Sequence, residues 1–296
     1  MEVVQESAYA KLNLGLDVLG RREDGYHLVR MVMQQVDIHD EISIYKTVDP
    51  DISLEADFGG VHLAEPMTMG DGNLCVIAAR AMGGRIGVHH GYFIHLAKRI
   101  PIAAGMAGGS SDAAAVLRAI NRLEGSPLSA EELKEIALGI GADVPYCVEG
   151  GTRLAEGIGE KLTELAFPGE WPVLVAKPPE GASTGEIYRA YDSEEDPERP
   201  DIDALIEALK GGDRNRICEC FGNALEPVTK RMLPQILRIE DMMKARGAVR
   251  ALMTGSGPTV FGIFEDEDSL MRAAAELRGS GLCETVAGTH FIKGGD

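Results

Sequence analysis

The chain has 296 residues, a length at which two domains are the ordinary expectation. Its formal net charge of −18 argues against binding to nucleic acid or to an anionic membrane, because both partners are negatively charged. It contains no apolar run long enough to span a membrane, and its start lacks the basic and apolar segments of a signal peptide. Five cysteines without a Cys-x-x-Cys pair indicate reduced, buried thiols in a cytoplasmic protein.

Residues 7–16 alternate in the manner of a β-strand, with alanines and leucines on one face. Tyr9, Lys11 and Asn13 share the other face. Because lysine is usually exposed, the residues alone favour a solvated face. The alternative is a ligand site, for which the small residues around Lys11 leave room.

A turn at Asp24-Gly25 then presents Tyr26 and His27 together. A flat aromatic ring beside an imidazole is suited to stacking on a heterocycle and hydrogen bonding to it. An ordinary hairpin turn accounts for the same residues, so the segment alone does not decide between the two interpretations.

The next part of the chain predicts short strands and a helix. Strands are expected over 31–36, 41–45, 52–56 and 92–96, with a turn over 37–40. Asn73 is a good N-cap for a helix over 74–82. Lys98 and Arg99 end the last of these strands, and they either offset the acidic background beside an anion site or are ordinary surface charges.

The stretch that follows carries the strongest functional signal. Three glycines and two serines stand directly before a helix predicted over 111–123, namely Gly105, Gly108, Gly109, Ser110 and Ser111. Glycines let successive N–H groups turn toward one point, and the helix adds its positive N-terminal end. This combination favours a phosphate-binding loop over a merely capped turn. It matches neither the Walker loop, which needs a lysine where Gly109 stands, nor the dinucleotide fingerprint.

The rest of the chain mixes strands and helices, as an α+β fold does. Ser129 and Glu132 form a capping-box sequence for a helix over 130–139. Asp143 precedes Val144-Pro145, which is typical of an N-cap. Further elements are expected as a hairpin of 152–155 and 160–165, a strand at 172–176, helices at 184–191, 201–210, 213–221, 234–246 and 267–278, a strand–turn–strand over 252–264 and a strand at 285–291.

Three segments together resemble the GHMP kinase superfamily, which includes galactokinase and the homoserine, mevalonate and phosphomevalonate kinases. Pro101, Gly105, Met106 and Ser110-Ser111 fit the phosphate-loop motif, while Gly-Ala-Asp-Val-Pro at 141–145 and the Gly-rich turn at 255–257 fit two others. The resemblance covers essentially the whole chain. It implies an α+β, two-domain GHMP kinase architecture, with a ribosomal-protein-S5-domain-2-like N-terminal domain over 1–151 and a ferredoxin-like C-terminal α/β sandwich over 152–296.

The segment AKLNLGLDVLGRREDGYH at 10–27 resembles one branch of the superfamily in particular. That branch phosphorylates the 2-hydroxyl of a cytidyl-diphosphate methylerythritol in the non-mevalonate isoprenoid pathway. The resemblance implies ATP and Mg²⁺ as cofactors, Asp143 as general base, and Lys11 as the cation that lowers the hydroxyl pKa and orients the base. No acidic metal ligand is evident, although Ser111 could reach Mg²⁺.

The resemblance also implies binding roles. The substrate side chains are Asn13 beside the reacting hydroxyl, Tyr26 and His27 on the cytosine, and Thr184 and Tyr188, four apart on one helix face, in the cytidine pocket. The ATP contacts are Asn73 near the adenine and the loop residues Pro101, Ile102, Ala103, Ala104, Gly105, Met106, Ala107, Gly108, Gly109, Ser110 and Ser111.

The loop departs from the family in one respect, because alanines stand at 103, 104 and 107 where glycine is frequent. Alanine limits the backbone geometry but keeps the N–H donors. The alternatives are a GHMP kinase acting on mevalonate, homoserine or a sugar, an inactive GHMP-fold sensor, and an unrelated phosphate-binding domain. Tyr26-His27 argues against the first, and Lys11 with Asp143 argues against the second. A homodimer in the cytoplasm is a further expectation.

Overall fold

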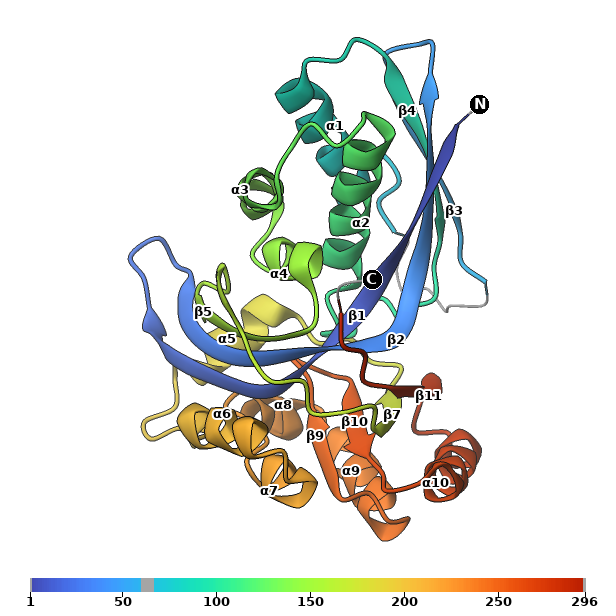
Figure 1. Ribbon diagram of the computed structural model, residues 1–296. Helices are drawn as coiled ribbons and strands as arrows, with labels where there is room; N and C mark the ends of the chain where they lie inside the picture. Colours follow the sequence, from blue (N-terminus) through green and yellow to red (C-terminus); the bar gives the residue numbers. More distant parts are fainter. Residues whose placement is uncertain (1, 60–66, 295–296) are drawn as a thin grey trace. The chain divides into compact units, whose positions relative to one another are not determined.

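The computed structural model describes residues 2–59 and 67–294, which form two compact units (Figure 1). The described residues of the first unit are 2–10, 38–59, 67–102 and 107–149. Those of the second are 11–37, 103–106 and 150–294. Two long strands, β1 (Val3–Arg21) and β2 (His27–Thr47), contribute residues to both units, so neither unit is one continuous segment. A domain boundary between residues 151 and 152 stays a prediction.

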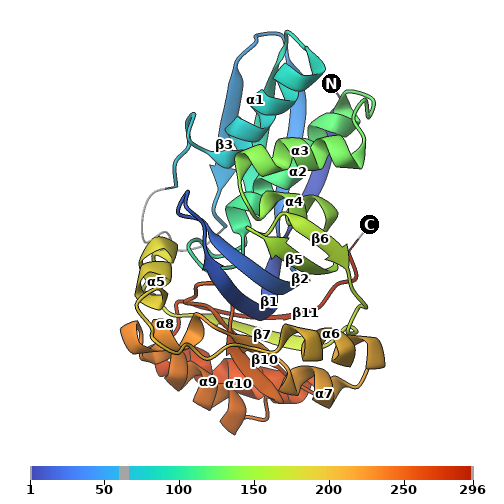
Figure 2. The ribbon, with the colours of Figure 1, turned by 90° about the vertical axis from the view of Figure 1, so that its left-hand side faces the viewer.

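In the first unit, helices lie on one face of a sheet with strand order β3-β4-β2-β1 (Figures 1 and 2). Strand β3 is parallel to β4, and β4 is antiparallel to β2, where Glu41–Thr47 pair with Gly91–Ala97. Buried Ile42, Ile44 and Leu96 contribute to the core of this unit. Its other described elements are β3 (Ile52–Asp57), α1 (Leu74–Ile86), β4 (Gly91–Ala97), α2 (Gly108–Leu123), α3 (Ala130–Ile140) and α4 (Val144–Glu149).

The second unit contains an antiparallel sheet of strand order β11-β7-β10-β9, against which α9 and α10 pack. Here β2 pairs with β5, and β1 pairs with the short strand β8 at Leu16 and Asn223. Its elements are β5 (Thr152–Gly157), β6 (Lys161–Glu164), β7 (Pro172–Lys177), α5 (Thr184–Tyr191), α6 (Ile202–Gly211), α7 (Arg214–Glu219), β8 (Gly222–Asn223), α8 (Glu226–Met232), α9 (Gln235–Ala245), β9 (Arg250–Met253), β10 (Val260–Ile263), α10 (Glu267–Ser280) and β11 (Thr285–His290). The predicted α+β class is confirmed.

Local capping signals predicted several helices well. The Asn73 side chain accepts a hydrogen bond from the Cys75 N–H at 2.9 Å and so caps α1. Ser129 and Glu132 form the predicted capping box of α3. No helix in the described part of the chain is long and apolar enough to cross a membrane.

Several local expectations differ from the structure. The turn expected over 37–40 is part of the continuous strand β2, because β2 pairs with β5 before this stretch and with β4 after it. Helix α2 begins at Gly108 rather than at 111. The elements β8 and α8 were not predicted. Of the five free cysteines, Cys220 and Cys283 are only half-buried, whereas the other three are buried as expected.

Candidate active site

The loop before α2 has an unusual backbone. Ala103, Gly105 and Ala107 have positive φ values of 52°, 71° and 58°, whereas the residues between them have negative values. An alanine in this left-handed region costs about 1–2 kcal/mol, so the two alanines keep the glycine-like geometry at the expense of strain. Alternating positive and negative φ values point successive N–H groups toward one side, where they form a concavity that binds anions. The loop therefore has the backbone that a phosphate site requires.

The first turn of α2 adds further donors. Ala107 occupies the N-cap position without a side-chain cap, and the first main-chain bond back to it comes from Ser111 N–H at 2.8 Å. The N–H groups of Gly108, Gly109 and Ser110 thus precede the intrahelical ladder and are open to a ligand. The Ser111 hydroxyl is buried and donates to the Tyr9 carbonyl at 2.6 Å.

A buried ionic cluster links the two ends of this loop to β2. The Lys98 ammonium donates to Asp40 and, at 2.7 Å, to Asp112 in α2. The other Asp40 oxygen accepts the N–H groups of Arg99 and Ile100. All three charged side chains are almost fully buried. The alternative that Lys98 is an ordinary surface charge is therefore wrong, because its side chain is buried and two internal carboxylates bind it. Whether Lys98 and Arg99 offset the acidic background for an anion stays a prediction.

Electrostatics within this cluster are set by burial and pairing. Burial acts to lower the pKa of Lys98, but the Asp112 and Asp40 charges outweigh it and raise that pKa. Burial raises the pKa of Asp112 well above its usual value, although the Lys98 charge opposes the shift. One Asp112 oxygen, Oδ1, has no hydrogen-bond partner, which is costly for a buried carboxylate. The cluster thus joins both ends of the loop to β2 through Lys98.

Lys11 and Asn13 are buried in β1, so the solvated face favoured by the residues alone is wrong. The Lys11 ammonium donates to Asn13 Oδ1 at 2.7 Å and to the carbonyl of Gly105 at 3.1 Å. The Lys11 N–H also donates to the Met106 carbonyl at 3.1 Å. The structure therefore places a buried cation of β1 in direct contact with the Gly-rich loop before α2.

The third Gly-rich segment packs against the same loop. A Cβ atom on Gly105 would lie 2.7 Å from the Thr254 carbonyl oxygen and 3.1 Å from that of Gly257. The Thr254 hydroxyl accepts the Asn13 N–H at 2.9 Å and lies 3.4 Å from Asn13 Oδ1. Backbone packing and a side-chain hydrogen bond thus join the turn to the loop and to β1.

Asp143 and Asn73 belong to the first unit. Asp143 is half-buried directly before α4, and its carbonyl accepts the Cys147 N–H at 3.1 Å. Asn73 uses its side chain to cap α1 and donates to the Thr68 carbonyl at 2.7 Å. The capping role that the sequence suggested for Asn73 is confirmed, whereas contact with adenine stays a prediction.

The predicted cytidine residues meet in part within the second unit. The His27 ring stacks on Tyr188 with centroids 4.4 Å apart, and its Nε2 lies 2.7 Å from Asp192 Oδ1. When neutral, the imidazole donates from Nε2 to Asp192 and keeps Nδ1 as an acceptor. Tyr26 is 58% exposed and available to a ligand, while the Thr184 hydroxyl lies 2.9 Å from that of Ser256.

Sequence reasoning missed several residues that support the site. Thr254 and Ser256 were recognised only as part of the predicted strand–turn–strand over 252–264, and Asp192 was assigned no role. The burial of Asp40 could have been suspected from the sequence, because this charged residue stands two positions before the apolar strand residues 42 and 44. The burial of Asp112 could have been suspected as well, because it stands on the apolar side of a helix. Among the described residues, no group of three or more His, Cys, Asp and Glu side chains is placed to hold a metal ion.

Comparison with known proteins gives consistent matches. A model of the GHMP kinases N terminal domain matches residues 73–151, and one of the GHMP kinases C terminal matches residues 200–281. The 4-diphosphocytidyl-2-C-methyl-D-erythritol kinase of Caldicellulosiruptor saccharolyticus is 45% identical over 92% of this chain and 91% of its own length. The protein of that name from Bacillus pumilus is 43% identical over 98% and 97%. A crystal structure of 4-(cytidine 5'-diphospho)-2C-methyl-D-erythritol kinase has a TM-score of 0.81 and 32% identity, covering 99% of this chain and all of that one.

Proposed function

The chain belongs to the GHMP kinase family, and from this membership we propose that it phosphorylates the 2-hydroxyl of 4-diphosphocytidyl-2-C-methyl-D-erythritol with ATP. The products are the 2-phosphate and ADP, in the non-mevalonate route to isoprenoid precursors. The α+β architecture expected of such a kinase is confirmed. Relatives of high coverage that carry this name support the substrate, as do the motifs around Lys11 and His27.

The observation that carries the proposal is the contact of buried Lys11 with both Asn13 and the phosphate loop. Phosphoryl transfer depends on alignment and on charge stabilisation more than on covalent chemistry. We assign Lys11 to the acceptor hydroxyl, whose pKa a cation lowers, and Asn13 to its orientation. Asp143 takes the proton as the oxygen attacks the γ-phosphorus and the bond to the β-phosphate oxygen breaks.

The nucleotide is assigned to the loop and to the start of α2. The left-handed residues Ala103, Gly105 and Ala107, followed by open N–H groups in the first helical turn, suit a triphosphate. Mg²⁺ would be held mainly by the ATP phosphates, with the Ser111 hydroxyl as the side-chain oxygen from the loop. When bound, it would supply positive charge to the transferred group. Asn73 is proposed to lie near the adenine in addition to capping α1.

The cytidine is assigned to the group around His27. Stacking of His27 on Tyr188 and its hydrogen bond to Asp192 hold the imidazole in one orientation, so that Nδ1 can accept from an exocyclic amine. Exposed Tyr26 offers a stacking surface for the base. Thr184 is proposed to complete the pocket.

The experiment is to measure ADP release from ATP and Mg²⁺ with the cytidyl-diphosphate substrate. Asp143→Ala is expected to lower kcat by about 10²–10⁴-fold, the usual contribution of a general base. Asp213→Ala is the matched control, because Asp213 is the N-cap of α7 and accepts the Arg216 N–H at 2.8 Å. Equal losses in both variants would identify Asp143 as a helix cap only.

Other results would point to the alternatives. Turnover on mevalonate or homoserine, with none on the cytidyl substrate, would refute the assignment of His27 to cytosine. Nucleotide binding without turnover on any acceptor would favour a sensor. Cytoplasmic location, a homodimer and the absence of nucleic-acid binding stay predictions of the sequence.

A further inference from the structure

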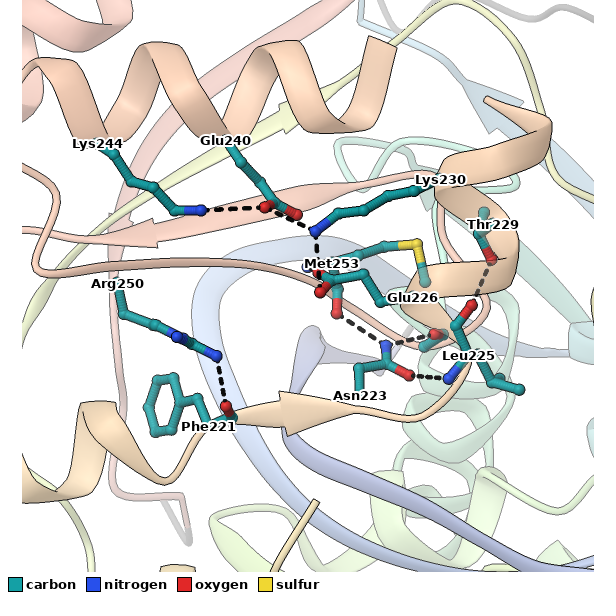
Figure 3. A network of polar contacts seen from close by, with 11 residues as sticks. Phe221, Asn223, Leu225, Glu226, Thr229, Lys230, Glu240, Lys244, Arg250 and Met253 are labelled. Carbon is teal, nitrogen blue, oxygen red and sulfur yellow. Dashed lines mark hydrogen bonds and ion pairs between the residues drawn. The ribbon is translucent and has the colours of Figure 1, made fainter. Parts of the chain in front are cut away.

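A buried asparagine outside the known motifs holds the third Gly-rich turn in place. Asn223 of β8 donates from its side-chain amide to the carbonyls of Met253 at 2.9 Å and Gly255 at 2.8 Å (Figure 3). These two carbonyls flank Thr254 on either side. The Asn223 Oδ1 accepts the Leu225 N–H at 3.0 Å, so this oxygen and both amide protons are engaged. The side chain therefore clamps the backbone that carries Thr254.

Two further hydrogen bonds connect Thr254 to Lys11, the proposed catalytic cation. Thr254 Oγ1 accepts the Asn13 N–H at 2.9 Å, and Asn13 Oδ1 accepts the Lys11 ammonium at 2.7 Å. Lys11 donates in turn to the Gly105 carbonyl. Asn223 also pairs with β1 itself at Leu16, in the strand that carries Lys11 and Asn13. All of these residues belong to the second unit.

Neighbouring contacts leave the turn little freedom to adjust by itself. Glu226 accepts the Met253 N–H at 2.7 Å, and its ion pair with Lys230 extends to Glu240 (Figure 3). The turn residues 254–257 are buried, and their backbone lies close to Gly105. Because the surroundings are close-packed, loss of the clamp is expected to be passed on to Thr254 rather than absorbed locally.

We propose that Asn223 is a positioning residue for phosphoryl transfer, acting through Thr254 on Asn13 and Lys11. This inference rests on the proposed function for its kinetic test. It assigns the role to the amide donors of Asn223, not to the oxygen that supports the start of α8 at Leu225.

The test separates the amide donors of Asn223 from its oxygen acceptor. Asn223→Asp keeps an acceptor for the Leu225 N–H but removes both donors, whereas Asn223→Ala removes everything. Both variants are expected to lower kcat about tenfold or more while changing KM for either substrate by less than about threefold. Asn121→Ala is the control, since buried Asn121 of the other unit also uses its side-chain amide as a donor and its Oδ1 as an acceptor, both with the backbone of Leu128. It should leave kcat unchanged.

A double variant tests whether Asn223 acts through Thr254. If Asn223 acts through Thr254, then Asn223→Asp combined with Thr254→Val should lose no more kcat than the more damaged single variant. Losses that multiply would overturn the inference. So would a kcat of Asn223→Asp equal to that of the wild type, because the acceptor alone would then suffice.

A readout without turnover separates this inference from the proposed function. Lysine side-chain NMR, with Lys11→Met to assign the signal, is expected to show the Lys11 ammonium signal shifted in Asn223→Asp and unshifted in Asn121→Ala. An unshifted signal in Asn223→Asp refutes the positioning role even if the wild type is an active kinase. A wild type without turnover on the cytidyl substrate refutes the proposed function, and the NMR signal still decides the positioning role.

Discussion

Replacing Asp40 by alanine is expected to destabilise the protein through the buried cluster of Asp40, Lys98 and Asp112. The Asp40 carboxylate accepts hydrogen bonds from two backbone N–H groups and from the Lys98 ammonium. Hydrogen bonds to charged groups contribute about 1.5–3 kcal/mol each, which gives about 5–9 kcal/mol if they were independent. Because Lys98 keeps Asp112 as a partner, we expect a loss of about 3–5 kcal/mol, the usual cost of removing one member of a buried ion pair.

The assay is urea unfolding followed by circular dichroism, with the free energy of unfolding compared at an unchanged slope. Asp40→Asn is the matched control, because its amide oxygen still accepts the Arg99 and Ile100 N–H groups. It should lose less than half as much stability as Asp40→Ala. Hydrogen exchange at the two N–H groups should accelerate in Asp40→Ala. A cost below about 1 kcal/mol, or equal costs for both variants, would refute the reasoning.

Three further predictions concern the site and its support. Gly105→Ala should lower ADP release and the free energy of unfolding together, because the added Cβ would lie 2.7 Å from the Thr254 carbonyl oxygen; unchanged values of both would contradict the packing. His27→Ala should raise KM for the cytidyl substrate about tenfold without changing KM for ATP. His90→Ala is the control, because His90 likewise pairs with a carboxylate, that of Glu124, and contacts an aromatic ring, that of Tyr92; it should leave both KM values unchanged. Burial raises the pKa of Glu240 from 4.5 to about 7, so the stability that its protonated form contributes is fully present below pH 4.5 and is lost as the pH rises through 7. The urea midpoint of the wild type should therefore fall relative to that of Glu240→Gln as the pH rises from about 5 to 8. Midpoints of the two proteins that change in parallel with pH would argue against a buried acid at Glu240.

Local patterns in the sequence predicted much of this protein. The N-cap Asn73, the capping box of Ser129 and Glu132, and the alternation around Lys11 each depend on hydrogen bonds or periodicity within a few residues. The Gly-rich loop belongs to the same class, because its glycines and the following helix already indicate an anion site. These signals are readable because the interacting groups are neighbours in the chain.

The tertiary structure alone decided which polar residues are buried, and with whom. Lys11 and Asn13 looked solvated on their strand face, but the Gly105 carbonyl and Thr254 cover them. An ordinary surface charge was one of two alternatives for Lys98, but Asp40, 58 residues away, and Asp112 pair with it inside the protein. The burial of a polar side chain depends on partners that the fold brings from distant segments, so its cost and its role cannot be calculated from neighbouring residues.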